Sequence, residues 1–155
     1  MKNHAIGTLL VLCALSASAA HAADLGYLGA WTITGAVIAP WADSARKPDV
    51  AERRRLMGRT VVFRARGISG PQPLNCPGAH YQIIDYTADM VFQGAFGEMH
   101  SRDKRVDPGR LAASLGFKGP QIRSLETGCE IDFHFVDPST AEFGLNDYVY
   151  TLKRR

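Results

Sequence analysis

Two cysteines and three histidines are the side chains beyond the first 22 residues with the greatest capacity for chemistry. They are Cys76, Cys129, His80, His100 and His134. A thiol beside a histidine can act as a nucleophile. Histidines grouped with carboxylates can bind a metal ion or transfer protons. The spacing of these residues and the elements that carry them decide among these roles.

The two cysteines are predicted to form a disulfide. An even pair in an exported chain is typical of a structural bridge. The bridge would close a loop of about 54 residues, which corresponds to roughly 4 kcal/mol of stabilisation in the chain-entropy model. A catalytic thiol would need a histidine partner and would have to escape oxidation, so the sequence favours the bridge.

His134 lies in an alternating stretch near the C-terminus. Alternation places Cys129, Ile131, Phe133 and Phe135 on one face of a strand, and Glu130, Asp132 and His134 on the other. The apolar face is expected to point into the core. His134 is therefore expected at the surface or at the mouth of a cavity, beside acidic side chains. Contact with a ligand and metal binding remain alternatives for it.

The sequence predicts no metal site, no cofactor and no catalytic residue. The three histidines are 20 and 34 residues apart, spacings that match no compact zinc pattern. The chain contains no G-x-S-x-G, H-E-x-x-H or G-x-G-x-x-G motif. A small hydrolase that uses His134 with Asp132 or Glu142 is kept as a third hypothesis.

The first 22 residues read as a cleaved secretory signal peptide. Lys2 and His4 precede the apolar run "IGTLLVLCALSASA", and Ala20-His21-Ala22 is a small-x-small cleavage site. A membrane-spanning helix needs about 20 apolar residues, and this apolar run is shorter than that. The sequence thus predicts a periplasmic or secreted protein without a membrane span, and one domain over residues 23–155.

The charge of this domain is small and spread along the chain. Without the first 22 residues, the chain contains 17 Lys and Arg residues and 15 Asp and Glu residues. Nucleic-acid binding needs a clustered basic face, so this class of partner is not expected. The basic clusters at 52–59 and 153–155 are interpreted as a solvated helix face and a polar tail.

Hydrophobic alternation predicts an all-β fold, with about eight antiparallel strands in a closed or nearly closed barrel and a meander at the C-terminus. The predicted strands cover 28–40, 59–67, 80–86, 89–96, 121–127, 129–136, 140–145 and 147–153, with a hairpin around 87–88. Two short helices are predicted, over 48–58 and over 107–116. Asp107 is the expected N-cap of the second, with Pro108 at its first position.

Two features carry a family resemblance. Gly29-Ala30-Trp31 resembles the G-x-W motif of lipocalins and related calycin barrels, in which the tryptophan packs against an arginine of the last strand. The resemblance implies a cation–π contact between Trp31 and Arg154, or Lys153. Of the T-D-Y motif of lipocalins, only Asp85-Tyr86 is present.

The chain is also similar in outline to small exported barrels of Gram-negative bacteria, among them META-type domains and periplasmic inhibitors of proteases and lysozyme. The shared features are the signal peptide, the early G-x-W, an "ISG" loop leading to a cysteine, and the final "YTLKRR" strand. Residues 97–120 look like an insertion. No loop matches an inhibitor signature, so no inhibitory residue is carried over.

These observations predict a non-enzymatic periplasmic binding protein that acts on a protein partner, such as a cell-wall hydrolase or a protease. Loops 68–81 and 96–105 are the predicted contacts. The candidate binding residues are Ser69, Gln72, Asn75, His80, Tyr81, His100, Arg102 and His134. The alternative is a lipocalin-like carrier of a small apolar ligand, with room left by inward small residues, namely Gly35, Ala65, Ala95 and Gly144.

Overall fold

The structure is a computed structural model that describes residues 26–155. The predicted signal peptide, residues 1–22, lies outside the described residues. No helix within 26–155 has the length and apolar character needed to cross a membrane. The elements, in chain order, are β1 (Gly29–Ile38), α1 (Val50–Leu56), β2 (Thr60–Arg64), β3 (Gly67–Ser69), β4 (Gln82–Tyr86), α2 (Val91–Arg102), α3 (Pro108–Ser114), β5 (Ile122–Glu126), β6 (Phe133–Asp137), β7 (Thr140–Leu145) and β8 (Tyr148–Arg154).

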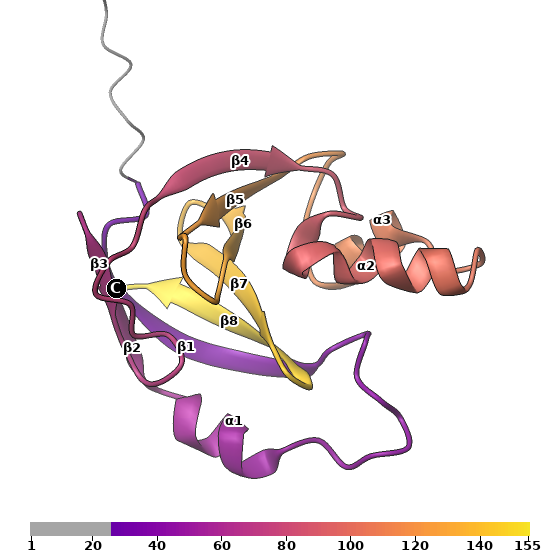
Figure 1. The fold of residues 1–155 in the computed structure, drawn as a ribbon, viewed down its shortest axis with the longest axis horizontal. Coiled ribbons are helices and arrows are strands. Elements are labelled where there is room, and N and C mark those ends of the chain that lie inside the picture. The colour runs from indigo at the N-terminus through magenta and orange to yellow at the C-terminus, as the bar shows by residue number, and fades with distance from the viewer. Residues whose placement is uncertain (1–25) are drawn as a thin grey trace, which may run out of the picture.

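The eight strands form one antiparallel sheet in the order β3-β2-β1-β8-β7-β6-β5-β4. Figure 1 shows this sheet curled into a half-barrel, with β4 and the β1–β8 pair on opposite sides. The predicted all-β, calycin-like architecture with a C-terminal meander is therefore confirmed. Full closure is not found, because β3 and β4 do not pair. The Tyr81 hydroxyl spans this seam and donates to the Gly67 carbonyl over 2.8 Å.

The concave face of the sheet holds the main core. Its largest members are fully buried aromatic and aliphatic side chains, namely Trp31, Ile33, Val61, Leu125, Phe133, Phe143, Tyr150 and Leu152. The rings of Phe143 and Tyr150 stack at 5.1 Å, and Phe133 meets Phe63 edge to face at 4.8 Å. Because large rings fill the concave face, the interior is packed rather than hollow.

Helix α1 covers part of this core. Asp49 caps its N-terminus, accepting from the backbone N–H groups of Ala51 and Glu52. Leu56 is fully buried in the core cluster, and the Glu52 carboxylate accepts from the Tyr150 hydroxyl over 3.0 Å. The helix predicted over 48–58 is thus present, shortened at both ends, and it begins after Asp49 rather than at Pro48.

The opposite face of the sheet is covered by α2 and α3, which pack on β-strand residues such as Ile122 and Val149. α3 has the predicted start, with Asp107 as N-cap and Pro108 in its first turn. The hairpin predicted around 87–88 is wrong, because only β4 forms and residues 91–102 form α2, which is interrupted by left-handed backbone at residues 92–94. Val91, Phe92 and Phe96 have strand-like propensity, but as a helix they cover the apolar outer face.

The predicted Cys76–Cys129 disulfide is present, with Cα atoms 6.5 Å apart. It ties the segment between β3 and β4 to the segment before β6. Such a bridge suits an oxidising compartment. Cys76 also pairs with Ile68 of β3 through two backbone hydrogen bonds.

Replacing both cysteines by serine is expected to lower the free energy of unfolding by about 2–5 kcal/mol, because the unfolded chain regains the freedom of the closed loop. Urea unfolding of the variant and of the oxidised protein measures the difference. The wild type with its disulfide reduced should have the same free energy of unfolding as the variant. An unchanged unfolding midpoint would contradict the bridge as a stabilising element.

Candidate functional site

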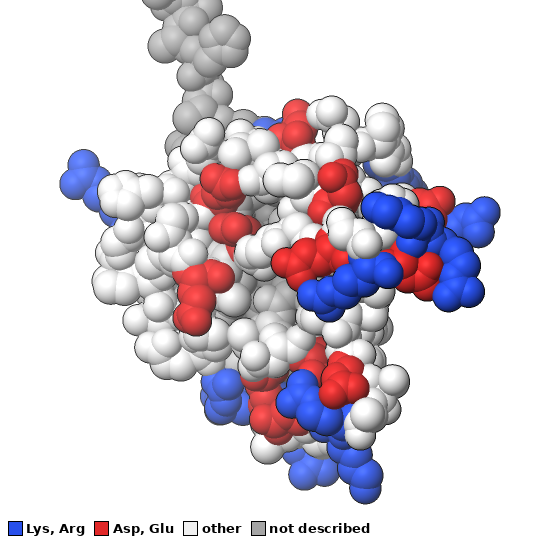
Figure 2. Space-filling view, turned by 45° about the vertical axis from the view of Figure 1, so that its right-hand side comes forward, with Lys and Arg blue, Asp and Glu red and all other residues white. Residues whose placement is uncertain are grey.

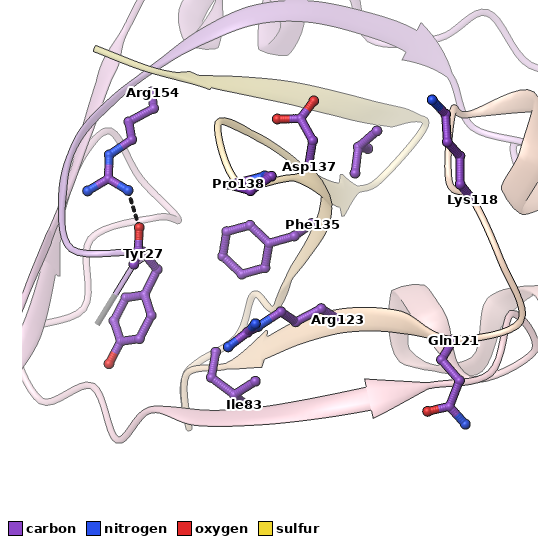
Figure 3. A pocket seen from close by; sticks show the side chains of 11 residues that line it. Tyr27, Ile83, Lys118, Gln121, Arg123, Phe135, Asp137, Pro138 and Arg154 are labelled. Atoms are coloured by element: carbon purple, nitrogen blue, oxygen red, sulfur yellow. Dashed lines mark hydrogen bonds between the residues drawn. The ribbon is translucent and has the colours of Figure 1, made fainter. Parts of the chain in front are cut away.

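A cleft of about 350 Å³ lies at the mouth of the half-barrel. Its apolar floor is formed by Tyr27, Ile83 and Phe135, with Phe135 also packed at 6.0 Å from the Trp31 ring. Figure 3 shows Phe135, Arg123 and Ile83 close together across the cleft, with Arg154 to one side and Lys118 to the other. Pockets of this size and apolar character are typical of small-ligand sites.

Cations dominate the rim of this mouth cleft. Lys118, Arg123 and Arg154 line it together with one acid, Asp137. The Asp137 carboxylate accepts two hydrogen bonds from Ser139, from the backbone N–H and from the hydroxyl, each 2.8 Å long. These bonds lower the pKa of Asp137, so it stays ionised. With three cations against one acid, the cleft has an excess positive charge.

The cation–π contact implied by the lipocalin resemblance is present at the edge of this cleft. The Arg154 guanidinium lies 5.7 Å from the centre of the Trp31 ring. Arg154 also donates to the carbonyl groups of Gly26 and Leu28, and the Trp31 indole N–H donates to the Tyr27 carbonyl over 2.9 Å. These bonds hold the segment before β1 across the mouth and fix the Tyr27 ring.

The predicted loop 68–81 supplies exposed side chains on a tied backbone. Gln72, Asn75 and His80 are exposed, and Ser69 is half-buried in β3. Tyr81 is also half-buried, with its ring 4.9 Å from that of Tyr27, and burial raises its pKa to about 12. Leu74 and Ala79 anchor the loop in the core.

The second predicted loop, 96–105, is mostly helix α2 and lies elsewhere. Arg102 is exposed and pairs with Glu98 on the same helix at 3.0 Å. The His100 ring Nδ1 is 2.7 Å from the Val106 carbonyl, a contact that ties α2 to the segment after it. Figure 1 shows α2 on the far side of the sheet from the segment that joins β3 to β4. The two predicted contact regions therefore do not form one surface.

His134 is not at the surface, and this expectation is wrong. It is 1% exposed, since α2 covers the outer face of β6. Phe92 contacts the imidazole edge to face, with ring centres 4.7 Å apart. The alternation of the strand placed His134 on the outer face correctly, but that face is covered by a helix the sequence did not predict.

Both ring nitrogens of His134 have structural partners. The Phe92 backbone N–H donates to Nε2 over 2.9 Å, so the neutral ring carries its proton on Nδ1. Nδ1 then donates to the Ser124 hydroxyl over 2.7 Å, and this hydroxyl donates to the Ile122 carbonyl. Burial lowers the pKa of His134 to about 3. The imidazole is neutral, enclosed and unable to accept a proton from Ser124.

The two acids suggested as partners of His134 have other surroundings. Asp132 accepts from the Thr127 backbone N–H and from the Gln93 side chain, and burial raises its pKa. Glu142 lies opposite His134 in the register of β6 and β7, but one carboxylate oxygen, Oε2, is buried without a hydrogen-bond partner. Burial raises the pKa of Glu142 to about 7, and a hydrogen bond with Thr151 partly offsets this rise.

Glu142→Gln is expected to stabilise the protein at alkaline pH. The folded-state pKa of Glu142 exceeds the ordinary value of 4.5, so its contribution to stability is present below pH 4.5 and is lost as the pH rises through 7. The shift corresponds to about 3 kcal/mol at pH 8.5, which the variant should largely recover. At pH 4 the two proteins should be equally stable.

Urea unfolding at a series of pH values measures this difference. The titration of His134 occurs in both proteins, so it cancels in the comparison. Glu130→Gln, at an exposed position, serves as the matched control and should change little at any pH. Equal stability of Glu142→Gln and wild type at pH 8.5 would contradict the prediction.

The small residues proposed as room for a ligand do not face the interior. Gly35 contacts Thr151 on the outer face, and Gly144 lies under the Trp41 ring, where an added Cβ would be 2.9 Å from that ring. Ala65 is exposed in the β2–β3 turn, and Ala95 lies on α2 against the outer cluster. The carrier hypothesis loses this support, and the mouth cleft replaces an internal cavity as the place for a ligand.

Sequence reasoning missed Lys118 and Arg123, the two cations that face Arg154 across the mouth cleft. One signal in the sequence pointed to Arg123. This residue is two positions before the buried Leu125 in β5, so strand alternation puts both side chains on the concave face of the sheet. Lys118 lies in a loop, where alternation gives no direction. Within residues 26–155, no three His, Cys, Asp or Glu side chains gather as metal ligands.

Comparisons with protein families, with curated proteins and with solved structures found no match to this chain. The functional interpretation therefore rests on the geometry of the described residues.

Proposed function

We propose that this chain is a non-enzymatic, exported binding protein whose mouth cleft takes a small ligand with an apolar body and an anionic group. The observation that carries the proposal is the combination in one cleft of an aromatic and aliphatic floor with an excess of cations. The floor of Tyr27, Ile83 and Phe135 suits an apolar chain or ring. The guanidinium of Arg123 suits a carboxylate, which it can bind through two hydrogen bonds.

The packed interior supports a ligand at the mouth rather than one deep inside the barrel. Trp31 and Phe133 are fully buried and fill the space below Phe135. The bonds from Arg154 to the Gly26 and Leu28 carbonyls hold one wall of the cleft in place before a ligand arrives, which reduces the entropy lost on binding. The hydrolase hypothesis finds no such support, since His134 is enclosed and hydrogen-bonded on both sides.

Arg123→Gln is expected to weaken binding of a medium-chain fatty acid by at least about tenfold, because a charge-assisted hydrogen bond contributes about 1.5–3 kcal/mol. Titration calorimetry gives the affinity for decanoate and for the uncharged decanol. Decanol tests the apolar floor alone, and the difference between the two affinities tests the cations. Decanoate should bind more tightly than decanol to the wild type, and the variant should lose this preference. Arg110→Gln, an exposed position on α3, is the matched control.

Two results would contradict the proposal. One is that neither compound binds. The other is that Arg123→Gln and Arg110→Gln bind decanoate as the wild type does. Native mass spectrometry of the protein purified from its own host complements the titration, since an adduct of small-molecule mass that is lost in Arg123→Gln would identify the natural ligand.

A second candidate function is contact with a protein partner through the segment between β3 and β4. The observation that favours it is a shallow cleft of about 590 Å³ lined by Tyr27, Arg66, Pro77, His80 and Tyr81, on a backbone tied by the disulfide. A polypeptide retained by the wild type and lost in His80→Glu, but kept in Arg102→Glu, would support this function. Retention by both variants would contradict it.

A further inference from the structure

Helix α1 and the turn after it carry arginines without acidic partners. Arg53, Arg54, Arg55 and Arg59 are all exposed, and no ion pair of the described residues includes any of them. Three of them lie in the last helical turn, where the helix dipole favours cations. That preference stabilises the helix but leaves the charges unneutralised.

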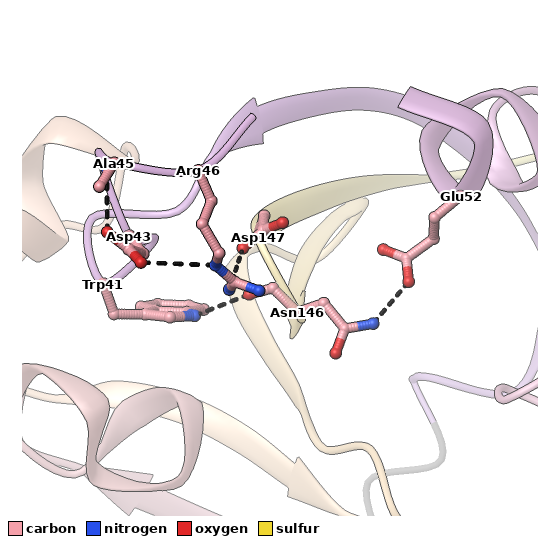
Figure 4. A network of polar contacts seen from close by, with 7 residues as sticks. All are labelled: Trp41, Asp43, Ala45, Arg46, Glu52, Asn146 and Asp147. Carbon is pink, nitrogen blue, oxygen red and sulfur yellow. Dashed lines mark hydrogen bonds and ion pairs between the residues drawn. The ribbon is translucent and has the colours of Figure 1, made fainter. Parts of the chain in front are cut away.

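The acids near this helix are engaged elsewhere. Glu52 is buried and accepts from the Asn146 side chain over 2.6 Å and from the Tyr150 hydroxyl over 3.0 Å. Asp49 caps the helix N-terminus. Figure 4 shows Glu52 directed at Asn146, while Arg46 bridges Asp43 and Asp147. The arrangement leaves no carboxylate for the four arginines.

The arginines of α2, of α3 and of the loop between them have acidic partners. Arg102, Arg105 and Arg110 pair with Glu98, Asp103 and Asp107 at 3.0, 2.8 and 3.7 Å. Figure 2 shows basic and acidic side chains intermixed on the right-hand side of the molecule, and also at its lower edge. The chain therefore neutralises exposed arginines in one region and leaves them unpaired in another. This contrast separates the α1 group from the arginines around α2 and α3.

Two of the unpaired arginines line one cleft. Arg55 and Arg59 border it together with Gly58, Thr60, Pro71 and Gln72, and its volume is about 690 Å³. The Arg59 Nε donates to the Arg55 carbonyl over 3.3 Å, and the Arg55 guanidinium donates to the Gln72 carbonyl. Both long side chains are thus fixed at the same cleft despite their like charges.

We propose that this cleft binds a phosphate ester. Two guanidinium groups offer paired N–H donors that match the oxygens of a phosphate, and the Thr60 hydroxyl at the same cleft is a further donor. A bound anion would relieve the repulsion between Arg55 and Arg59. Arg53 and Arg54, beside the cleft on the same helix, would draw anions towards it. The site shares no residue with the mouth cleft.

A phosphate ester can come from a free metabolite or from an anionic lipid headgroup, and two probes distinguish these sources. Glycerol 3-phosphate is titrated by calorimetry, and vesicles of phosphatidylglycerol are compared with vesicles of phosphatidylcholine by co-sedimentation, both at low ionic strength. Binding of glycerol 3-phosphate would indicate that a free phosphate ester is sufficient to occupy the cleft. Binding of phosphatidylglycerol vesicles alone indicates a membrane surface. Either result is expected to disappear at high salt.

Arg59→Glu should weaken whichever binding is found by at least tenfold. Arg110→Glu makes the same change of charge on α3 and should leave binding within twofold of the wild type. Thermal melting of both variants controls for folding, and Arg59→Gln replaces Arg59→Glu if the latter melts early. The proposal is overturned if neither probe binds the wild type at low salt, or if the two charge-reversal variants lose binding equally.

Discussion

Replacing His134 by alanine is expected to lower the free energy of unfolding by about 3–5 kcal/mol, because it leaves a cavity, removes two buried hydrogen bonds and leaves the buried Phe92 N–H without a partner. The Phe92 N–H and the Ser124 hydroxyl both bond to the imidazole, and both are enclosed. Neither group can turn to water without moving α2. The effect is therefore large for a residue with no proposed catalytic role.

The backbone of α2 adds to this expectation. Phe92, Gln93 and Gly94 have left-handed φ angles of 52°, 55° and 80°. Non-glycine residues adopt this region only where their surroundings hold them in it. The bond from the Phe92 N–H to His134 is one such restraint, and the Gln93 side chain bonds Asp132 at 3.3 Å.

Urea unfolding and amide hydrogen exchange measure the result. In His134→Ala, residues near Phe92 should exchange faster than in the wild type, because the left-handed turn loses its anchor. His80→Ala is the matched control. The His80 side chain is exposed, so its removal should change the free energy of unfolding by less than about 0.5 kcal/mol. Similar effects of the two substitutions would contradict the structural role of His134.

The pH dependence of stability gives a second readout of the same residue. The folded-state pKa of His134, about 3, lies below the ordinary value of 6.5. Its contribution is present above pH 6.5 and is lost as the pH falls towards 3, at about 1.4 kcal/mol for each pH unit. This loss on acidification should be absent in His134→Ala.

Trp31→Ala is expected to cost about 3–5 kcal/mol, the range for removing a large buried ring. Trp31 is fully buried, with Phe63 edge to face at 6.2 Å and Phe135 at 6.0 Å. The alanine variant also loses the hydrogen bond from the indole N–H to the Tyr27 carbonyl and the cation–π contact with Arg154. Because Tyr27 and Phe135 form the floor of the mouth cleft, the same substitution should abolish ligand binding there.

Thermal and urea unfolding of Trp31→Ala and Trp31→Phe measure this effect. Phenylalanine keeps a ring against Phe63 but lacks the indole N–H, so its cost should be smaller than that of alanine. A near-neutral Trp31→Ala would contradict a closing role for this residue. Loss of stability with full retention of decanoate binding would separate the core from the mouth cleft.

The sequence by itself determined the parts of this protein that depend on local pattern. Alternation placed β1, β2 and β4 to β8, although β6 begins at Phe133 rather than at Cys129. It also put Phe133 inside with His134 on the other face. Asp107 and Pro108 marked the start of α3, because capping is a local hydrogen-bond requirement. The two cysteines that follow the predicted signal peptide can make only one intramolecular bridge with each other, and that bridge is present.

Only the tertiary structure decided which faces are covered. Val91, Phe92 and Phe96 suit a strand by propensity, yet the apolar outer face of β5 to β8 is buried when they form a helix. That choice encloses His134 and Glu142, which alternation alone would leave in water. The curl of the sheet brings Arg123 of β5 and Arg154 of β8 to one mouth. Such non-local contacts depend on how distant segments pack, and no local pattern of residues specifies them.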